Sequence, residues 1–362
     1  MRILFLTYQG DVAGSTYSIS YLAKGLAARG HSIYIGIRKE SLLWQLMENT
    51  EVSRIPMTFN GKFDFSNWKK IRDVVKKFEI DLINAQSSYD RYTSIFSKMR
   101  YGFQAKIIHT RRQMPLSIGG PIQLYLYNKK TDGIVAVSQQ MKKGLCRLGI
   151  HSEHIKVIPN GTPVEKYRNV SEEKVTDLKH KFNITKNDFV IGCVSRMKNQ
   201  LQIVKAIEKL DFSVKIIFCG ISPTPEMEQI VNRCNEKHSF FFEGHAEPTE
   251  ILAYHKIFNI HVLASTMEGL SQSLLEAMAM GTPVVATAYA GNIDLIDHEK
   301  NGLLFEDNNI DALVSQIDRL YHDESLLKRL ATAGKKTALE DFNIEKTVSN
   351  YEEYFLQMVT EN

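Results

Sequence analysis

Short apolar runs alternate with helical patterns along the whole chain. An apolar run at residues 2–8 is followed by a loop at 10–14 and by a helical pattern at 15–29, which Gly30 is suited to end. Later apolar runs of four to six residues, separated by further helical patterns, lie at 32–37, 81–85, 106–109 and 133–137. Strands that alternate with helices in this way predict a parallel sheet covered by helices.

The same alternation restarts in the second half of the chain. It follows a turn signal at Pro159-Asn160-Gly161 and a charged helix around residues 172–182. The expected strands lie at residues 190–194, 214–218, 240–242, 260–263, 283–286 and 302–305. A last amphipathic helix is predicted at 345–358, with Val348, Tyr351, Tyr354 and Phe355 near one face. We therefore expect two α/β domains, which suits a length of 362 residues.

Composition narrows the class of protein. The chain is 43% hydrophobic and 24% charged, which excludes a disordered, collagen-like or coiled-coil protein. Its four cysteines include no CxxC pair, so we expect free and mostly buried thiols. No apolar stretch approaches the roughly 18 residues of a membrane span, and the N-terminal apolar run is too short for a secretory signal, so a cytoplasmic protein is expected.

Charge is distributed unevenly between the halves. Residues 1–165 carry a net charge of +12 and residues 166–362 a net charge of −8. The basic excess lies mainly at 69–77, 91–112 and 129–147, with aromatic residues between. Such a surface can bind anionic lipid, a phosphorylated substrate or nucleic acid, or can be an ordinary solvated surface. Nucleic-acid binding is disfavoured because no helix-turn-helix, RNA-recognition or zinc motif is present.

Two open α/β sheets bind ligands at the carboxyl ends of their strands. The common phosphate and catalytic fingerprints are absent, since the sequence has no GxxxxGK[ST], GxGxxG, HExxH or GxSxG. It has no Asp-x-Asp pair either, which argues against a metal-dependent sugar-nucleotide site built on two aspartates. The site has to be assembled from other residues.

The segment at 265–287 is the most informative one. It contains a loop at 269–271, a helix at about 272–280 and a stop at Gly281. The free N–H groups of a helix start suit a phosphate or a sugar hydroxyl. Glu268 precedes the loop, and Glu276 lies in apolar company within the helix, where a carboxylate needs a partner. In the alternative interpretation Ser273 and Glu276 form a capping box and Glu268 is solvated.

The two glutamates, in EGLSQSLLEAMAMGTPVVAT, resemble the E-x7-E motif of the family 4 glycosyltransferases, which adopt the GT-B fold. Further segments resemble the family in the same order over nearly the whole chain: Ala13-Gly14 with Leu22-Ala23, Leu26 and Arg29-Gly30-His31, Asp132–Ser138 with Val157–Gly161, Gly192–Arg196, Phe218–Gly220, Phe242–Gly244 and Asn301–Leu304. The resemblance implies two Rossmann-like domains, residues 1–165 completed by 344–362 on the acceptor side and residues 166–343 binding the nucleotide sugar.

Site roles also follow from the resemblance. Glu276 would bind the ribose hydroxyls and Glu268 the donor sugar, while the backbone of Gly269, Leu270 and Ser271 would meet the sugar and phosphates. Arg196 would neutralise the diphosphate, which gains charge as the glycosidic bond breaks. In the first domain, Gly14 would form a close-approach loop and His109 would reach the transferred sugar.

Several positions depart from the family pattern. The family lysine follows the arginine by about five residues, whereas here Lys198 follows Arg196 by two and fills that role only if the loop contracts. Where relatives read D.ihaH, this chain reads Asp81-Leu-Ile-Asn-Ala-Gln86, which removes two histidines. Arg111 and Arg112 directly follow Thr110 and either hold an acceptor phosphate or carboxylate or form a surface pair.

The resemblance implies a retaining glycosyltransferase that needs no metal or other cofactor. Its donor would be a nucleotide sugar, UDP by default, and its acceptor a hydroxyl. The basic first half of the chain suggests that the acceptor is a lipid-linked saccharide or a lipopolysaccharide or polysaccharide precursor at an anionic membrane surface. The acceptor would attack on the face from which the diphosphate leaves. A sugar-nucleotide epimerase or hydrolase of the same fold, and a non-catalytic nucleotide-sugar-binding partner, remain alternatives.

Overall fold

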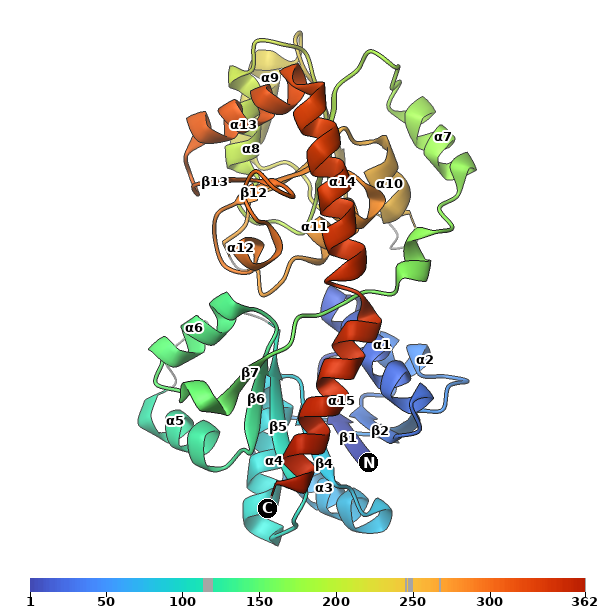
Figure 1. The fold of residues 1–362 in the computed structure, drawn as a ribbon, viewed down its shortest axis with the longest axis vertical. Coiled ribbons are helices and arrows are strands. Elements are labelled where there is room, and N and C mark those ends of the chain that lie inside the picture. The colour runs from blue at the N-terminus through green and yellow to red at the C-terminus, as the bar shows by residue number, and fades with distance from the viewer. Residues whose placement is uncertain (113–119, 245, 247–249, 267, 362) are drawn as a thin grey trace. The chain divides into compact units, whose positions relative to one another are not determined.

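The computed structural model describes residues 1–112, 120–244, 246, 250–266 and 268–361 (Figure 1). It divides the chain into two compact units, which we describe separately. Unit 1 is Met1–Pro163 with Asn343–Asn362, and unit 2 is Val164–Phe342. The division falls two residues before the boundary that the sequence predicts after Glu165.

The described part of unit 1 contains one sheet of seven parallel strands in the order β3-β2-β1-β4-β5-β6-β7. The strands are β1 (Arg2–Leu6), β2 (Ser32–Ile37), β3 (Ser53–Pro56), β4 (Leu82–Ala85), β5 (Lys106–Arg111), β6 (Gly133–Ala136) and β7 (Ile155–Val157). The sequence prediction missed β3 and β7. Both are short edge strands, and the polar Arg54 and Lys156 leave no apolar run to mark them.

Helices cover both faces of this sheet. They are α1 (Gly14–Ala28), α2 (Leu42–Leu46), α3 (Phe65–Phe78), α4 (Ser88–Tyr101), α5 (Gly120–Lys129), α6 (Gln139–Arg147) and α15 (Ile344–Thr360). One cluster of buried side chains joins α1 and α15 to the sheet, and a second joins α3 to the opposite face.

The last helix of the chain is part of unit 1. Val348, Tyr351 and Phe355 of α15 are fully buried against α1 and the sheet. Two residues of the segment Arg29-Gly30-His31 anchor this helix. Arg29 and His31 lie 2.8 and 2.7 Å from the carboxylate of Glu352, which belongs to α15. The hydrogen bond from Arg29, followed by that of His31, lowers the pKa of Glu352. The C-terminal helix therefore packs on the first half of the chain.

The described part of unit 2 has a second parallel sheet of six strands, in the order β10-β9-β8-β11-β12-β13. They are β8 (Val190–Val194), β9 (Lys215–Cys219), β10 (Ser239–Glu243), β11 (Ile260–Leu263), β12 (Val284–Thr287) and β13 (Leu303–Phe305). Its helices are α7 (Glu172–Lys181), α8 (Leu201–Lys209), α9 (Pro225–Cys234), α10 (Ile251–Ile257), α11 (Gln272–Met280), α12 (Asn292–Leu295), α13 (Ile310–His322) and α14 (Glu324–Glu340), and the short helix η2 (Val164–Tyr167) precedes them.

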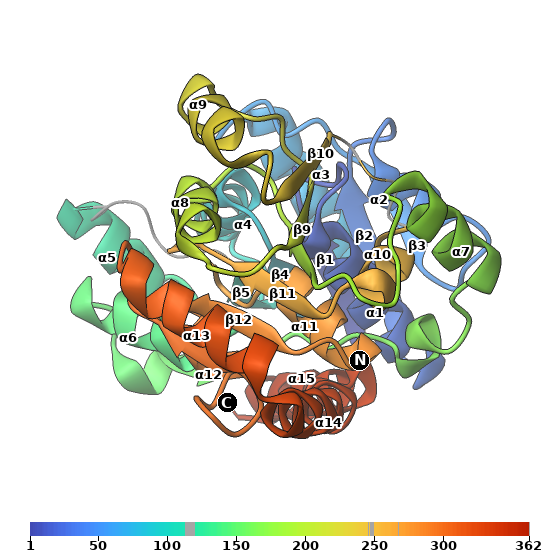
Figure 2. The same ribbon diagram turned by 90° about the horizontal axis from the view of Figure 1, so that it is seen from above.

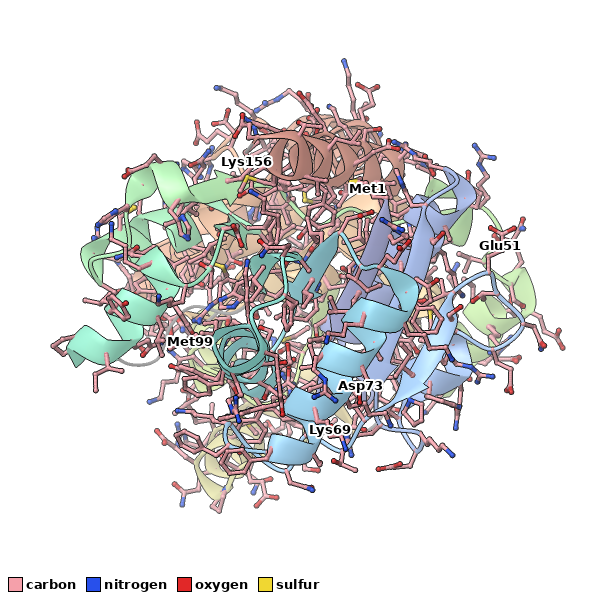
Figure 3. The ribbon with its side chains drawn as sticks, turned by 90° about the horizontal axis from the view of Figure 1, so that it is seen from below. Met1, Glu51, Lys69, Asp73, Met99 and Lys156 are labelled. Atoms are coloured by element: carbon pink, nitrogen blue, oxygen red, sulfur yellow. The ribbon has the colours of Figure 1, made fainter. Side chains whose placement is uncertain are left out.

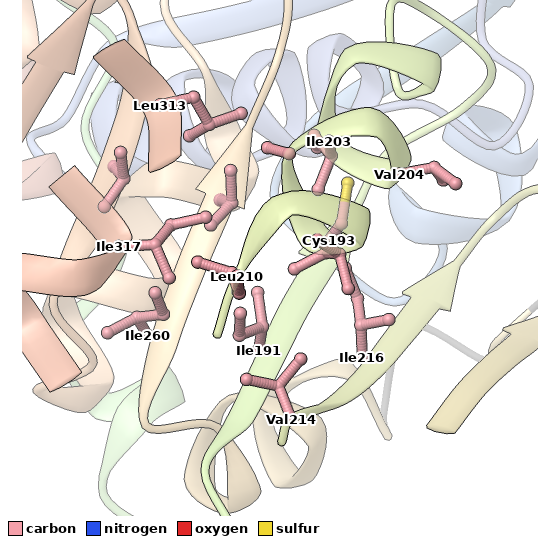
Figure 4. Close-up of a cluster of buried hydrophobic side chains, with 14 of the residues drawn as sticks. Ile191, Cys193, Ile203, Val204, Leu210, Val214, Ile216, Ile260, Leu313 and Ile317 are labelled. Atoms are coloured by element: carbon pink, nitrogen blue, oxygen red, sulfur yellow. The ribbon is translucent and has the colours of Figure 1, made fainter. Parts of the chain in front are cut away.

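The core of unit 2 lies between its sheet and these helices. Figure 2 shows α8, α9 and α13 to one side of the strands and α7 and α10 to the other. Figure 4 shows how Ile191 and Cys193 of β8 meet Ile203 of α8 and Ile317 of α13. The four cysteines are unpaired, and Cys193, Cys219 and Cys234 are buried.

Each sheet has one point where the strand order reverses. In unit 1 this point lies between β1 and β4, and in unit 2 it lies between β8 and β11. Connections leave neighbouring strands in opposite directions there, which opens a crevice at their carboxyl ends. Ligand-binding side chains are therefore expected at these two crevices.

Candidate functional site

An ion pair lies at the reversal point of the sheet in unit 2. Lys198 follows β8 and Glu268 follows β11, and the Lys198 ammonium contacts the Glu268 carboxylate. Both side chains are 17% exposed. The Ser265 hydroxyl donates a second hydrogen bond of 3.2 Å to the same carboxylate oxygen. The structure thus brings together two residues that the sequence separates by seventy positions.

The shortened loop that carries Arg196 and Lys198 is held by a buried glutamine. The Gln200 side chain accepts the backbone N–H of Lys198 at 2.6 Å and donates to the Arg196 carbonyl at 2.8 Å and to the Ser195 hydroxyl at 2.7 Å. Burial, together with the neighbouring Arg196 charge, lowers the pKa of Lys198 to about 8, and the Glu268 carboxylate opposes this by stabilising the ammonium form. Arg196 itself is exposed.

Glu276 lies within α11 and forms an ion pair with Lys166 of η2. Its side chain is 11% exposed. The capping-box interpretation is wrong, because the N-cap of α11 is Ser271, whose hydroxyl accepts the Leu274 N–H, and Glu276 reaches Lys166 instead. The sequence indicates only that Glu276 needs a partner. It does not reveal Lys166, which lies 110 residues away.

The loop between the two glutamates is packed from behind by Gly291. A Cβ atom at this position would lie 2.0 Å from the Gly269 carbonyl oxygen, and the Gly291 N–H donates to the Glu268 carbonyl at 3.0 Å. Ser271, the N-cap of α11, is buried, and Leu270, which lies between Gly269 and Ser271 in the sequence, is half-buried. Gly269, Leu270 and Ser271 therefore have a fixed backbone immediately before the N-terminus of α11.

Unit 1 has a cavity of about 450 Å³ at the carboxyl ends of β1, β4 and β5. Arg111 and Arg112 line it, as do Arg91 of α4 and Tyr127 of α5. Ser15 and Thr16 of α1 contribute another wall. Gly14 is the first residue of α1 rather than part of the loop before it, and it directly precedes that wall.

His109 is placed differently from the two arginines. It lies in β5 and is fully buried, and it is not among the residues lining the cavity. Its ring packs edge-on against Tyr127 with centroids 5.2 Å apart. Burial, with the charges of Arg91 and Arg111, holds the pKa of His109 well below its ordinary value, so the imidazole is neutral. Neither ring nitrogen makes a hydrogen bond of ordinary geometry within the described residues.

The part of the chain that the structure describes has neither a cluster of metal-binding side chains nor a membrane-spanning helix. No three His, Cys, Asp or Glu side chains gather there in an arrangement that could hold a metal ion. None of the helices there combines the length and hydrophobicity of a membrane span.

Comparisons with known proteins cover almost the whole chain. Residues 12–166 match the family described as Glycosyltransferase Family 4, and residues 175–337 match Glycosyl transferases group 1. The N-acetyl-alpha-D-glucosaminyl L-malate synthase of Bacillus anthracis is 23% identical, over 99% of this chain and 97% of that protein.

Two solved structures share the fold. A glycosyltransferase from Rickettsia africae superposes with a TM-score of 0.86 at 23% identity, covering 100% of this chain and 99% of its own. The Anabaena protein HepE, in complex with UDP and glucose, superposes with a TM-score of 0.84 at 20% identity, covering 99% and 100%. The predicted arrangement of two α/β units with parallel sheets is confirmed.

Proposed function

Because this chain is a family 4 glycosyltransferase with the GT-B fold, we propose that it moves a sugar from a UDP-sugar to a hydroxyl acceptor with retention of anomeric configuration. The observation that carries the proposal is the cluster at the reversal point of unit 2. There a carboxylate, Glu268, and two cations, Arg196 and Lys198, lie beside the fixed loop at the start of α11. UDP is proposed because the similar Anabaena structure contains it.

Each residue of this cluster has a proposed role that its chemistry supports. Arg196 and Lys198 neutralise the diphosphate as its negative charge grows, so that no metal is required. Glu268 holds the donor sugar, and the loop at Gly269–Ser271 offers backbone N–H groups to the sugar and phosphates. Glu276 accepts hydrogen bonds from the ribose hydroxyls, in exchange for part of its contact with Lys166.

The chemical step follows from the same arrangement. The acceptor hydroxyl attacks the anomeric carbon on the face from which the diphosphate departs, and its proton passes to the leaving phosphate. In unit 1, Gly14 and His109 are proposed to contact the donor sugar, and Arg111 and Arg112 to hold the acceptor. The ring of His109 is buried against Tyr127.

A thermal-shift panel tests the donor assignment. We expect one of UDP, GDP, ADP and CMP to raise the melting temperature, since a ligand at about 100 times its Kd stabilises by roughly 2.7 kcal/mol. Glu276→Ala should abolish that shift because the ribose contact is lost. The matched variant Glu299→Ala removes an exposed carboxylate of unit 2 and should keep the shift.

If no nucleotide or nucleotide sugar raises the melting temperature of the protein, a non-catalytic role is favoured. Conversion of the donor without acceptor favours an epimerase or hydrolase.

We further propose that this enzyme works in the cytoplasm on a lipid-linked or polysaccharide-precursor acceptor at an anionic membrane surface. The support is a group of exposed side chains, formed by Phe63 just before α3, Phe65 and Lys69 of α3, and Met99 and Arg100 of α4. Phe63, Phe65 and Met99 are 66%, 67% and 55% exposed. Figure 3 shows the two helices side by side, with Lys69 on α3 and Met99 on α4.

Vesicle cosedimentation tests this membrane contact. We expect binding to vesicles that contain anionic lipid at low salt, and weaker binding at 0.5 M salt because the charges are screened. The double variant Phe63→Ser/Phe65→Ser should reduce binding, whereas Ile122→Ser, which removes a still more exposed apolar side chain on α5, serves as control. Equal sedimentation of the protein with and without vesicles at low salt would contradict the proposal.

A further inference from the structure

Three arginines line the cavity of unit 1 without an acidic partner. Arg91 comes from α4, Arg111 ends β5 and Arg112 follows it. Within the described residues, none of the three forms an ion pair with Asp or Glu. Other arginines of the unit do: Arg2 pairs with Asp81, Arg29 with Glu352 and Arg38 with Asp11, each within 3 Å.

Besides having no carboxylate partner among the described residues, these guanidinium groups are largely shielded from water. Arg91 is only 8% exposed, and the Nε atoms of Arg91 and Arg112 are buried with no acceptor among the described residues. Burial, followed by the charge of Arg91, lowers the pKa of Arg111 to about 10. Unpaired buried charges of one sign oppose folding, so their gathering at a cavity indicates an anion that binds there.

The nearest carboxylate does not serve as that anion. Asp90 precedes Arg91 and accepts the backbone N–H groups of Tyr8, Gln86 and Ser87 at 3.2, 2.7 and 2.8 Å. Complete burial raises the pKa of Asp90 to about 7. The backbone N–H groups and the Arg91 charge act in the opposite direction. The carboxyl group of Asp90 is engaged in fixing the start of α4.

A chain of neutral side chains positions Arg112. Its guanidinium donates to the Gln86 side-chain carbonyl, and the Gln86 amide donates to Asn84. Asn84 in turn donates to Thr110 at 3.1 Å and to the Ile108 carbonyl at 3.2 Å. Asn84 and Gln86 are the two positions at which the sequence departs from a family histidine. Amide side chains at these positions carry no positive charge, and the side-chain oxygen of Gln86 accepts the hydrogen bond that orients Arg112.

Tyr127 completes the wall with a hydroxyl between two of the arginines. Although burial raises the pKa of this phenol, the charges of Arg91 and Arg111 outweigh it, and the pKa of Tyr127 is lowered. A hydroxyl polarised in this way is a good hydrogen-bond donor to an anion. The cavity volume of about 450 Å³ leaves room for more than the anionic group alone.

We infer that the cavity of unit 1 binds the acceptor through a dianionic group, a phosphate monoester or a dicarboxylate, held by Arg91, Arg111 and Arg112. The identification of this ligand as the acceptor rests on the proposed glycosyl transfer. The binding of the dianion itself does not.

Titration calorimetry on the whole chain tests the inference, with inorganic phosphate and succinate as probes and sodium chloride of equal ionic strength as blank. The background variant Arg196→Ala removes a phosphate contact of unit 2. In this background we expect at least one of the two probes to bind. When Arg91→Gln or Arg111→Gln is added, the Kd of that probe should rise tenfold or more, because a hydrogen bond to a charged group is lost. Added Lys156→Gln, an exposed charge of the same unit, should change the Kd less than twofold.

The outcomes separate this inference from the proposed function. Preference for phosphate or for succinate identifies the dianion and supports the inference in either case. Absence of binding by both probes, or equal Kd values in the arginine variants and in Lys156→Gln, overturns it. UDP binding to the Arg91→Gln and Arg111→Gln chains, made with Arg196 intact, reports that unit 2 is folded. A wild-type chain that binds phosphate in this cavity but no nucleotide would refute the proposed transfer and leave the anion site standing.

Discussion

Glu268→Gln is expected to lower kcat by about 10²–10³, the usual effect of removing one preorganised charge from an active site. Glutamine keeps the shape of the side chain and its hydrogen bond from Ser265. It loses the negative charge that pairs with Lys198 and that, in the proposed function, holds the donor sugar. The Kd of UDP should change less than about threefold, because the nucleotide is held by other residues in this proposal.

Initial rates with the donor selected by the thermal-shift panel give kcat, and calorimetry gives the Kd of UDP. Glu299→Gln is the matched control, since this exposed glutamate of unit 2 also pairs with a cation, Arg319. Its kcat should equal that of the wild type. An unchanged kcat in Glu268→Gln would rule out a role for this carboxylate in the chemical step.

Arg196→Ala is expected to weaken UDP binding about 10- to 150-fold, which corresponds to the roughly 1.5–3 kcal/mol of a hydrogen bond to a charged group. Lys198 compensates only in part, because its ammonium is also paired with Glu268. Arg196 is exposed, so its guanidinium is accessible to the nucleotide. The loss should be much smaller for UMP, which lacks the second phosphate.

Calorimetric Kd values for UDP and UMP at two salt concentrations check this expectation. Arg233→Ala provides the control, because it removes an exposed arginine of the same unit that pairs with Glu208. A similar loss of affinity for UDP and UMP in Arg196→Ala would mean that Arg196 supports the fold of the loop rather than the distal phosphate.

The sequence was a good guide to the fold where burial leaves a pattern. Strands in the middle of each sheet, such as β1 and β8, are covered on both faces and appear as nearly continuous apolar runs. Edge strands β3 and β7 do not need to be apolar on both faces, so no such run marks them. The amphipathic pattern of α15 predicted four of its buried residues, and the structure adds Ile344 and Thr347 to the same buried face.

The candidate site was predictable only in part. The spacing of Glu268 and Glu276 identified both glutamates, because the short segment that carries them is itself a motif. Their partners Lys198 and Lys166 come from distant segments, and no local signal reveals Lys166. Arg91 was also missed as a site residue. Its position in a helix resembles that of any solvated basic residue until the fold buries it beside Arg111.

The anchoring of α15 by Arg29 and His31 has a consequence for the biosynthesis of the chain. The ribosome releases Met1–Pro163 first, but the helix that closes this unit emerges only after the intervening 164–342 segment. At about 5–20 residues per second that segment takes roughly 10–40 s to make. During this interval the apolar face that α15 will cover stays open, whereas unit 2 is continuous in sequence and can fold as it emerges. A premature stop near the C-terminus would therefore damage the part of the protein that was synthesised first.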